Sequence, residues 1–201
     1  MAELTTDKTA LLVIDLQNGF CHPDGSFGQM DMPVENLAAA IPGSRRLVEA
    51  ARAAGVPVIF TQYQYRPDYK DGGILVDEIL PTLADLNSLA AGTWDAAIVD
   101  EFVVGDDDFV VQKNRYSAFY GTRLEPMLTS MGITSLVMCG VTTNMCVETS
   151  ARDAAQRDYK TWVVGDATGE LDAERQTHAL GTLAFGFCWV TSTDDVVAAW
   201  T

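Results

Sequence analysis

The stretch Ala10-Leu11-Leu12-Val13-Ile14, followed at once by Asp15, decides the fold class. Five consecutive apolar residues ending in two β-branched ones are typical of a strand buried on both faces, as in a parallel sheet covered by helices. Five similar runs follow along the chain, at 56–60, 109–111, 136–139, 161–164 and 187–190. The sequence therefore predicts six strands.

Helical segments separate these runs. Residues 44–54 are rich in alanine and stop at Gly55, which suits the position after a helix C-terminus. Three more helices are expected. One begins at a capping box formed by Thr122 and Glu125 and ends at Gly132. The others run from a Thr143 cap to about residue 158, and from an Asp172 cap to Gly186. Residues 21–32 and 62–76 are expected to be irregular loops. Alternating strands and helices predict an α/β fold with a parallel sheet, and we expect residues 1–201 to form a single domain.

Composition limits the function. The 28 acidic residues outnumber the 13 basic ones, for a net charge of −15, which argues against binding to nucleic acid or to an anionic membrane. No apolar run reaches the roughly 18 residues of a membrane span, and the first residues do not resemble a signal peptide. The four cysteines form no C-x-x-C pair. We expect a cytoplasmic protein that acts on a small molecule.

Three reactive side chains follow predicted strands. Asp15 follows the first, Lys113 the third, and Cys146 lies in the first turn of the helix after the fourth. Taken singly, they could be a turn residue, a surface lysine and a buried apolar thiol. Because the carboxyl ends of parallel strands meet at one edge, the three are expected to converge there. A thiol whose pKa is lowered by a helix N-terminus, with a base and a cation beside it, suits nucleophilic attack on a carbonyl carbon.

Three blocks of sequence, at 12–20, 113–119 and 139–147, resemble the isochorismatase-like cysteine hydrolase superfamily. The resemblance implies a Rossmann-like three-layer sandwich, with a six-stranded parallel sheet of order 3-2-1-4-5-6 and helices on both faces. It also implies that Asp15 accepts and donates protons, that Lys113 is the cation and that Cys146 is the nucleophile. A cis peptide bond before Thr142 is implied too, with the N–H groups of Thr142 and Cys146 forming the oxyanion hole.

Departures from the family pattern narrow the activity. Nicotinamidase-like members carry a metal-binding Asp-x-His after the second strand, whereas residues 61–66 contain no histidine, so no metal or other cofactor is expected. The blocks at 92–95 and 113–119 look more like those of ureidoacrylate, biuret and N-carbamoylsarcosine amidohydrolases. The resemblance thus implies a metal-independent amidohydrolase that releases ammonia from a small linear amide, ureido or carbamoyl compound through a thioester. Alternatives are an isochorismatase-type vinyl-ether hydrolase, which Cys146 disfavours, and a non-catalytic binding protein.

Substrate-binding residues are less well defined by the sequence. Aromatic residues near the three blocks could wall the pocket or belong to the core: Phe20, Trp94, Tyr116 and Phe119. Asn18 could orient an amide or hold a turn, and Arg115 could bind a carboxylate. The resemblance also implies a homo-oligomer, a dimer or tetramer, for which three apolar tryptophans add a weak argument.

Overall fold

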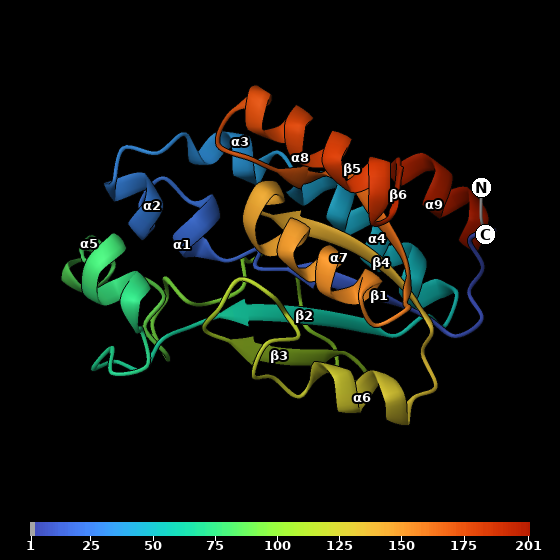
Figure 1. Cartoon of the computed structure of the whole chain (residues 1–201), viewed down its shortest axis with the longest axis horizontal. Coiled ribbons are helices and arrows are strands. Elements are labelled where there is room, and N and C mark those ends of the chain that lie inside the picture. The colour runs from blue at the N-terminus through green and yellow to red at the C-terminus, as the bar shows by residue number, and fades with distance from the viewer. Residues whose placement is uncertain (1–2) are drawn as a thin grey trace.

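The computed structural model describes residues 3–201, in which a six-stranded sheet forms the middle layer (Figure 1). Its order is β3-β2-β1-β4-β5-β6, and all five pairings are parallel. The strands are β1 (Thr9–Ile14), β2 (Val58–Tyr63), β3 (Phe109–Lys113), β4 (Ser135–Val141), β5 (Lys160–Gly169) and β6 (Trp189–Thr191). The predicted fold class and strand order are confirmed.

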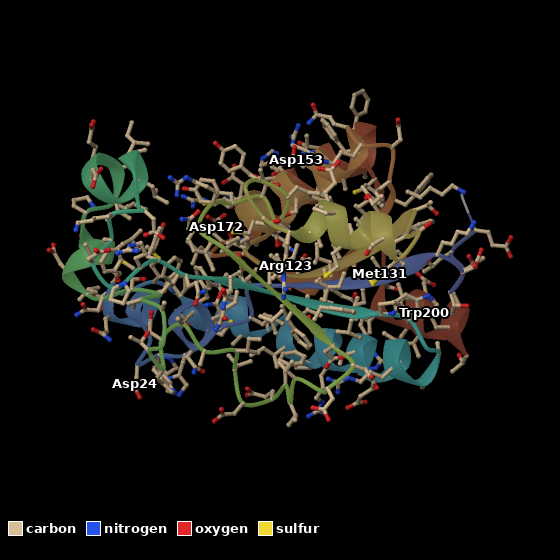
Figure 2. All side chains as sticks on the ribbon, turned by 90° about the horizontal axis from the view of Figure 1, so that it is seen from below. Asp24, Arg123, Met131, Asp153, Asp172 and Trp200 are labelled. Carbon is tan, nitrogen blue, oxygen red and sulfur yellow. The ribbon has the colours of Figure 1, made fainter. Side chains whose placement is uncertain are left out.

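Helices cover both faces of this sheet. Those in residues 3–201 are α1 (Asn18–Cys21), α2 (Ser26–Gln29), α3 (Val34–Ala38), α4 (Ile41–Ala53), α5 (Thr82–Asp85), α6 (Leu124–Ser130), α7 (Glu148–Ala155), α8 (Ala173–Gly186) and α9 (Thr193–Trp200), with π-helical turns η1 (Leu75–Ile79) and η2 (Thr143–Val147). α4 and α9 pack together on one face, and α7 and α8 lie on the other with α6 (Figures 1 and 2).

Burial on both faces explains the apolar sequences of the two central strands, β1 and β4. Every residue of β1 and of β4 is buried, as continuous apolar runs require when both faces are covered. Gly140 of β4 has φ of 111°, and a Cβ atom there would lie 2.0 Å from the carbonyl oxygen of Ile14. Only glycine allows β4 to approach the end of β1 this closely. The two strands thereby bring their carboxyl ends together.

Two of the three expected helix caps are wrong. The residue before α6 is Arg123 rather than Thr122, whose hydroxyl accepts from the N–H of Leu124 at 3.1 Å. Thr143 does not cap a helix either, because its hydroxyl donates to the carbonyl of Gly169 at 3.0 Å. Asp172 caps α8 as predicted and accepts from the N–H of Arg175 at 2.8 Å. A tertiary hydrogen bond therefore overrules the local signal at Thr143, whereas the Thr122 hydroxyl makes only local hydrogen bonds.

Other element boundaries also shift. α4 starts at Ile41, earlier than expected, because Pro42 is tolerated in the first turn, where an N–H has no helical partner. The expected loop at 21–32 contains the short helix α2. β3 runs on to Lys113, which pairs in register with Tyr63 of β2. No helix of residues 3–201 is long and apolar enough to cross a membrane.

Candidate active site

Asp15, Lys113 and Cys146 meet at the carboxyl edge of the sheet, as the sequence predicts. The Lys113 ammonium lies 2.6 Å from Oδ2 of Asp15, and both side chains are fully buried. The same ammonium donates to Sγ of Cys146 at 3.4 Å. Carboxylate, cation and thiol are therefore grouped together, and the Lys113 ammonium contacts both of the others.

The Lys113 ammonium is fixed on its remaining sides. It donates to the carbonyl oxygen of Arg115 at 3.0 Å and lies 4.2 Å from the centre of the Tyr63 ring. The Tyr63 hydroxyl is held in turn by the Asn114 carbonyl at 3.1 Å. A buried ammonium needs such partners because it has lost its water.

Thr61 is a residue that the sequence analysis did not single out. Its hydroxyl donates to Oδ1 of Asp15 at 2.6 Å and lies 3.1 Å from the Asp15 N–H, which donates to it. Asp15 itself has φ of 52°, a left-handed conformation that turns the chain at the end of β1. In the sequence, Thr61 directly follows the predicted strand at 56–60. Its position late in a strand next to β1 was the available signal.

Burial raises the pKa of the Cys146 thiol well above its ordinary value. The Lys113 ammonium opposes this rise, whereas the charge of Asp15 and its hydrogen bond to the thiol add to it. The expectation of a lowered pKa is therefore wrong. Cys146 lies in the π-helical turn η2, and loss of solvation is the largest cause of the rise. The raised pKa favours the neutral thiol over the thiolate at Cys146.

The backbone before Cys146 has the conformation that the resemblance implies. The Val141–Thr142 peptide bond is cis, and it joins the end of β4 to η2. Thr142 and Cys146 both lie on the wall of one cavity.

That cavity has a volume of about 180 Å³. Its wall is mainly apolar and aromatic, with few polar residues. It is lined by Phe20, Phe27, Met32, Tyr63, Tyr65, Leu75, Leu80, Leu83, Leu89, Tyr116, Thr142, Asn144, Met145, Cys146, Glu170, Leu171 and Arg175. The thiol thus faces a small, largely apolar chamber.

Only part of the predicted substrate-binding set reaches this chamber. Phe20 and Tyr116 line it. Asn18 instead donates to the Trp94 carbonyl at 2.9 Å, and the Trp94 ring is half-exposed against His22, with ring centres 5.0 Å apart. These contacts show Asn18 and Trp94 holding a loop together.

Phe119 and Arg115 also lie off the cavity wall. Phe119 is buried against Tyr159, with ring centres 5.9 Å apart, and belongs to the core. The Arg115 guanidinium donates to the carbonyl oxygens of Asp71 and Asn114, at 3.0 and 2.6 Å. The structure therefore does not bring Arg115 to the chamber as an anchor for a carboxylate.

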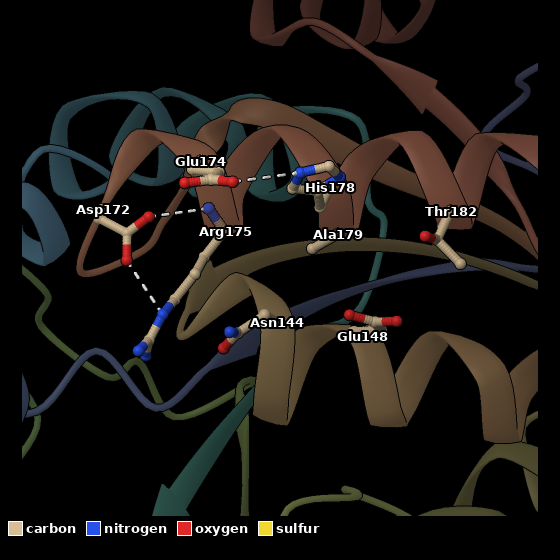
Figure 3. Close-up of a pocket in the computed structure, with 8 residues that line it drawn as sticks. All are labelled: Asn144, Glu148, Asp172, Glu174, Arg175, His178, Ala179 and Thr182. Atoms are coloured by element: carbon tan, nitrogen blue, oxygen red, sulfur yellow. Dashed lines mark hydrogen bonds and ion pairs between the residues drawn. The ribbon is translucent and has the colours of Figure 1, made fainter.

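A wider depression lies beside the chamber, between α8 and the start of α7 (Figure 3). It is open and polar, and the three reactive side chains take no part in its wall. Arg175 and Asn144 border both hollows. Nε of Arg175 lies 2.9 Å from Oδ2 of Asp172, an ion pair visible in Figure 3.

Residues 3–201 contain no cluster of three or more His, Cys, Asp or Glu side chains that could hold a metal ion. His22 pairs with Asp24 and His178 with Glu174, both at the surface. Metal independence remains a prediction.

Residues 9–195 match the model of the isochorismatase domain. The chain belongs to the isochorismatase family. It is 36% identical to the ureidoacrylate amidohydrolase RutB of Methylobacterium radiotolerans, over 91% of this chain and 76% of that protein. It is 34% identical to the ureidoacrylate amidohydrolase RutB of Azorhizobium caulinodans, over 96% of this chain and 90% of that protein. A crystal structure of a cysteine hydrolase from Pseudomonas syringae pv. phaseolicola has a TM-score of 0.91 at 30% identity, covering 100% of this chain and 95% of that one. The predicted family is confirmed.

Proposed function

We propose that this member of the isochorismatase family is a cysteine amidohydrolase, which releases ammonia from a small amide, ureido or carbamoyl compound. The observation that carries the proposal is the position of the Lys113 ammonium, 2.6 Å from Asp15 and 3.4 Å from the Cys146 sulfur, beside the chamber. Relatives named as amidohydrolases, at about one-third identity over most of the chain, support it.

In the first half-reaction, Cys146 attacks the amide carbon and its thiol proton passes to Asp15. The carbonyl oxygen becomes an oxyanion, which the N–H groups of Thr142 and Cys146 bind. As this intermediate collapses, the C–N bond breaks and Asp15 returns the proton to the departing nitrogen. Ammonia leaves and an acyl or carbamoyl thioester remains on Cys146.

In the second half-reaction, Asp15 takes a proton from water and the resulting hydroxide attacks the thioester carbon. The C–S bond breaks, the sulfur regains its proton from Asp15, and the acid is released. Lys113 takes no part in these proton transfers. It stabilises the Asp15 carboxylate and any thiolate that forms at Sγ.

The proposal is tested by an ammonia-release screen over small amides, ureas and carbamoyl acids, with Cys146→Ala as the blank. The proposal is supported if the wild-type protein releases ammonia from at least one compound and Cys146→Ala releases none from it. Absence of ammonia from the whole panel, or equal release by the variant, contradicts it.

Metal independence is part of the proposal. We expect unchanged ammonia release after dialysis against a strong chelator, because the reaction above uses only protein groups. Activity lost on dialysis and restored by one added divalent metal would contradict this part. A nicotinamidase-type relative with a bound metal, treated identically, is the control for chelation.

We further propose that the protein is a cytoplasmic homo-oligomer, a dimer or tetramer. The family resemblance supports the assembly. Sedimentation at micromolar concentration should give a mass of at least two chains, and a monomer would contradict this.

A further inference from the structure

The chamber beside Cys146 offers a substrate very little charge. Twelve of its seventeen lining residues are apolar or aromatic, and they surround about 180 Å³. A dry apolar cavity of similar size, about 150 Å³, binds benzene. The chamber therefore has room for a hydrocarbon group of several carbon atoms next to the amide.

Two cations near this chamber, Lys113 and Arg175, each contact a carboxylate. Lys113 contacts the Asp15 carboxylate, the Cys146 sulfur and the Arg115 carbonyl, and its side chain is fully buried. Arg175 lies on the wall, but its side chain is half-exposed and its Nε pairs with Asp172. Neither provides an unpaired positive charge inside the chamber.

The polar groups of the wall include acceptor oxygens from Glu170 and Asn144. The carboxyl group of buried Glu170 accepts from the N–H groups of Asn144 and Leu171, at 2.8 and 2.9 Å. The Asn144 Oδ1 atom is buried and accepts no hydrogen bond from the described residues. Acceptors suit an amide NH₂ group and oppose an anion, and the net charge of −15 disfavours the approach of anions from solution.

We propose that the preferred substrates are neutral primary amides with an apolar acyl group, rather than amides or ureido compounds that carry a carboxylate. This inference rests on the proposed amidohydrolase function and adds its substrate class. Ureidoacrylate carries a carboxylate, so the inference separates this chain from the relatives named for that compound.

The test compares two amides of equal heavy-atom number, 4-methylpentanamide and succinamate, in which an isopropyl group replaces a carboxylate. The wild-type protein should show kcat/KM at least about tenfold higher for 4-methylpentanamide, the order of discrimination that one or two apolar carbons provide. Equal values or a preference for succinamate would overturn the substrate class. A succinamate preference that disappears in Arg175→Gln would show that Arg175 reads the carboxylate.

A pair of neighbouring variants localises the effect. Leu80 lines the chamber and its side chain is 40% exposed, whereas Ile79 is 61% exposed and lies off the wall. Leu80→Lys should shift the kcat/KM ratio towards succinamate by at least tenfold, and Ile79→Lys should leave it unchanged. Because both positions are exposed, neither lysine forces a charge into the core. Equal ratios in Leu80→Lys and the wild type would contradict the assignment of the apolar wall.

Binding to Cys146→Ala separates this inference from the proposed function. Calorimetry with the same two compounds requires no turnover, and 4-methylpentanamide should bind at least tenfold more tightly. If the wild type released no ammonia but this preference held, the amidohydrolase proposal would fail and the apolar specificity of the chamber would stand. If neither compound bound, or succinamate bound more tightly, the substrate class would be wrong.

Discussion

The inner end of the chamber and its outer rim are built in different ways. At the inner end, Asp15 and Lys113 are fully buried, and strand ends hold them with short polar contacts. At the rim, Leu80 is 40% exposed and belongs to the long connection between β2 and β3. On the proposed function, the sheet edge would hold the reacting groups and the connections would select the substrate.

The largest expected effect is at the inner end. Cys146→Ala should abolish ammonia release, because no other group at this site can carry the acyl intermediate. Removing one sulfur atom should cost less than about 2 kcal/mol of unfolding free energy. Ammonia assays and urea unfolding check the two statements. Cys139→Ala, which truncates another buried thiol in β4, is the matched control and should retain activity.

Asp15→Asn should lower kcat by about 10²- to 10⁴-fold, the usual contribution of a positioned acid–base group. It should also destabilise the fold by about 3–5 kcal/mol, because Lys113 would be left buried without its counter-charge. Stopped-time ammonia assays and urea unfolding measure both. A variant with near-normal kcat would remove Asp15 from the proton transfers.

Thr61→Val should lower kcat by about 10- to 100-fold with little change in KM. The valine keeps the shape but loses the hydrogen bond to the Asp15 carboxylate, worth about 1.5–3 kcal/mol for a charged partner. Thr61→Ser keeps the hydroxyl and should restore most of the rate. If serine and valine lower kcat equally, Thr61 acts through packing rather than by positioning Asp15.

The smallest effect is a pH dependence. Because burial raises the pKa of Cys146, its thiolate fraction should be low at neutral pH and still increase above about pH 9, beyond the ordinary thiol pKa of about 8.5. The rate of Cys146 alkylation by iodoacetamide, followed by peptide mass, should therefore keep rising across that range. A plateau below about pH 7 would indicate the lowered pKa that the sequence alone suggests.

The inner end could largely be predicted from the sequence. Asp15, Lys113 and Cys146 each follow an apolar strand run, and a parallel sheet must bring such positions to one edge. Burial of the Cys146 thiol could not be predicted in this way, because it depends on how closely η2 packs against the walls of the chamber. For that reason the sequence predicts a lowered pKa for Cys146, whereas burial raises it.

The rim was the less predictable region. Arg115 belongs to the motif that carries Lys113, yet its guanidinium turns to the Asp71 and Asn114 carbonyls. Leu80 has no motif around it and nevertheless lines the chamber. Long connections are positioned by tertiary contacts, and local sequence contains little information about them.

The central claim is that Cys146 carries a covalent intermediate, and intact-protein mass spectrometry of acid-quenched reactions tests it most directly. With a turned-over amide, the wild-type protein should gain the mass of one acyl group less one hydrogen, on the peptide that contains Cys146. Cys146→Ala should gain nothing and release no ammonia. Ammonia release by Cys146→Ala at a rate comparable with that of the wild type would contradict the account.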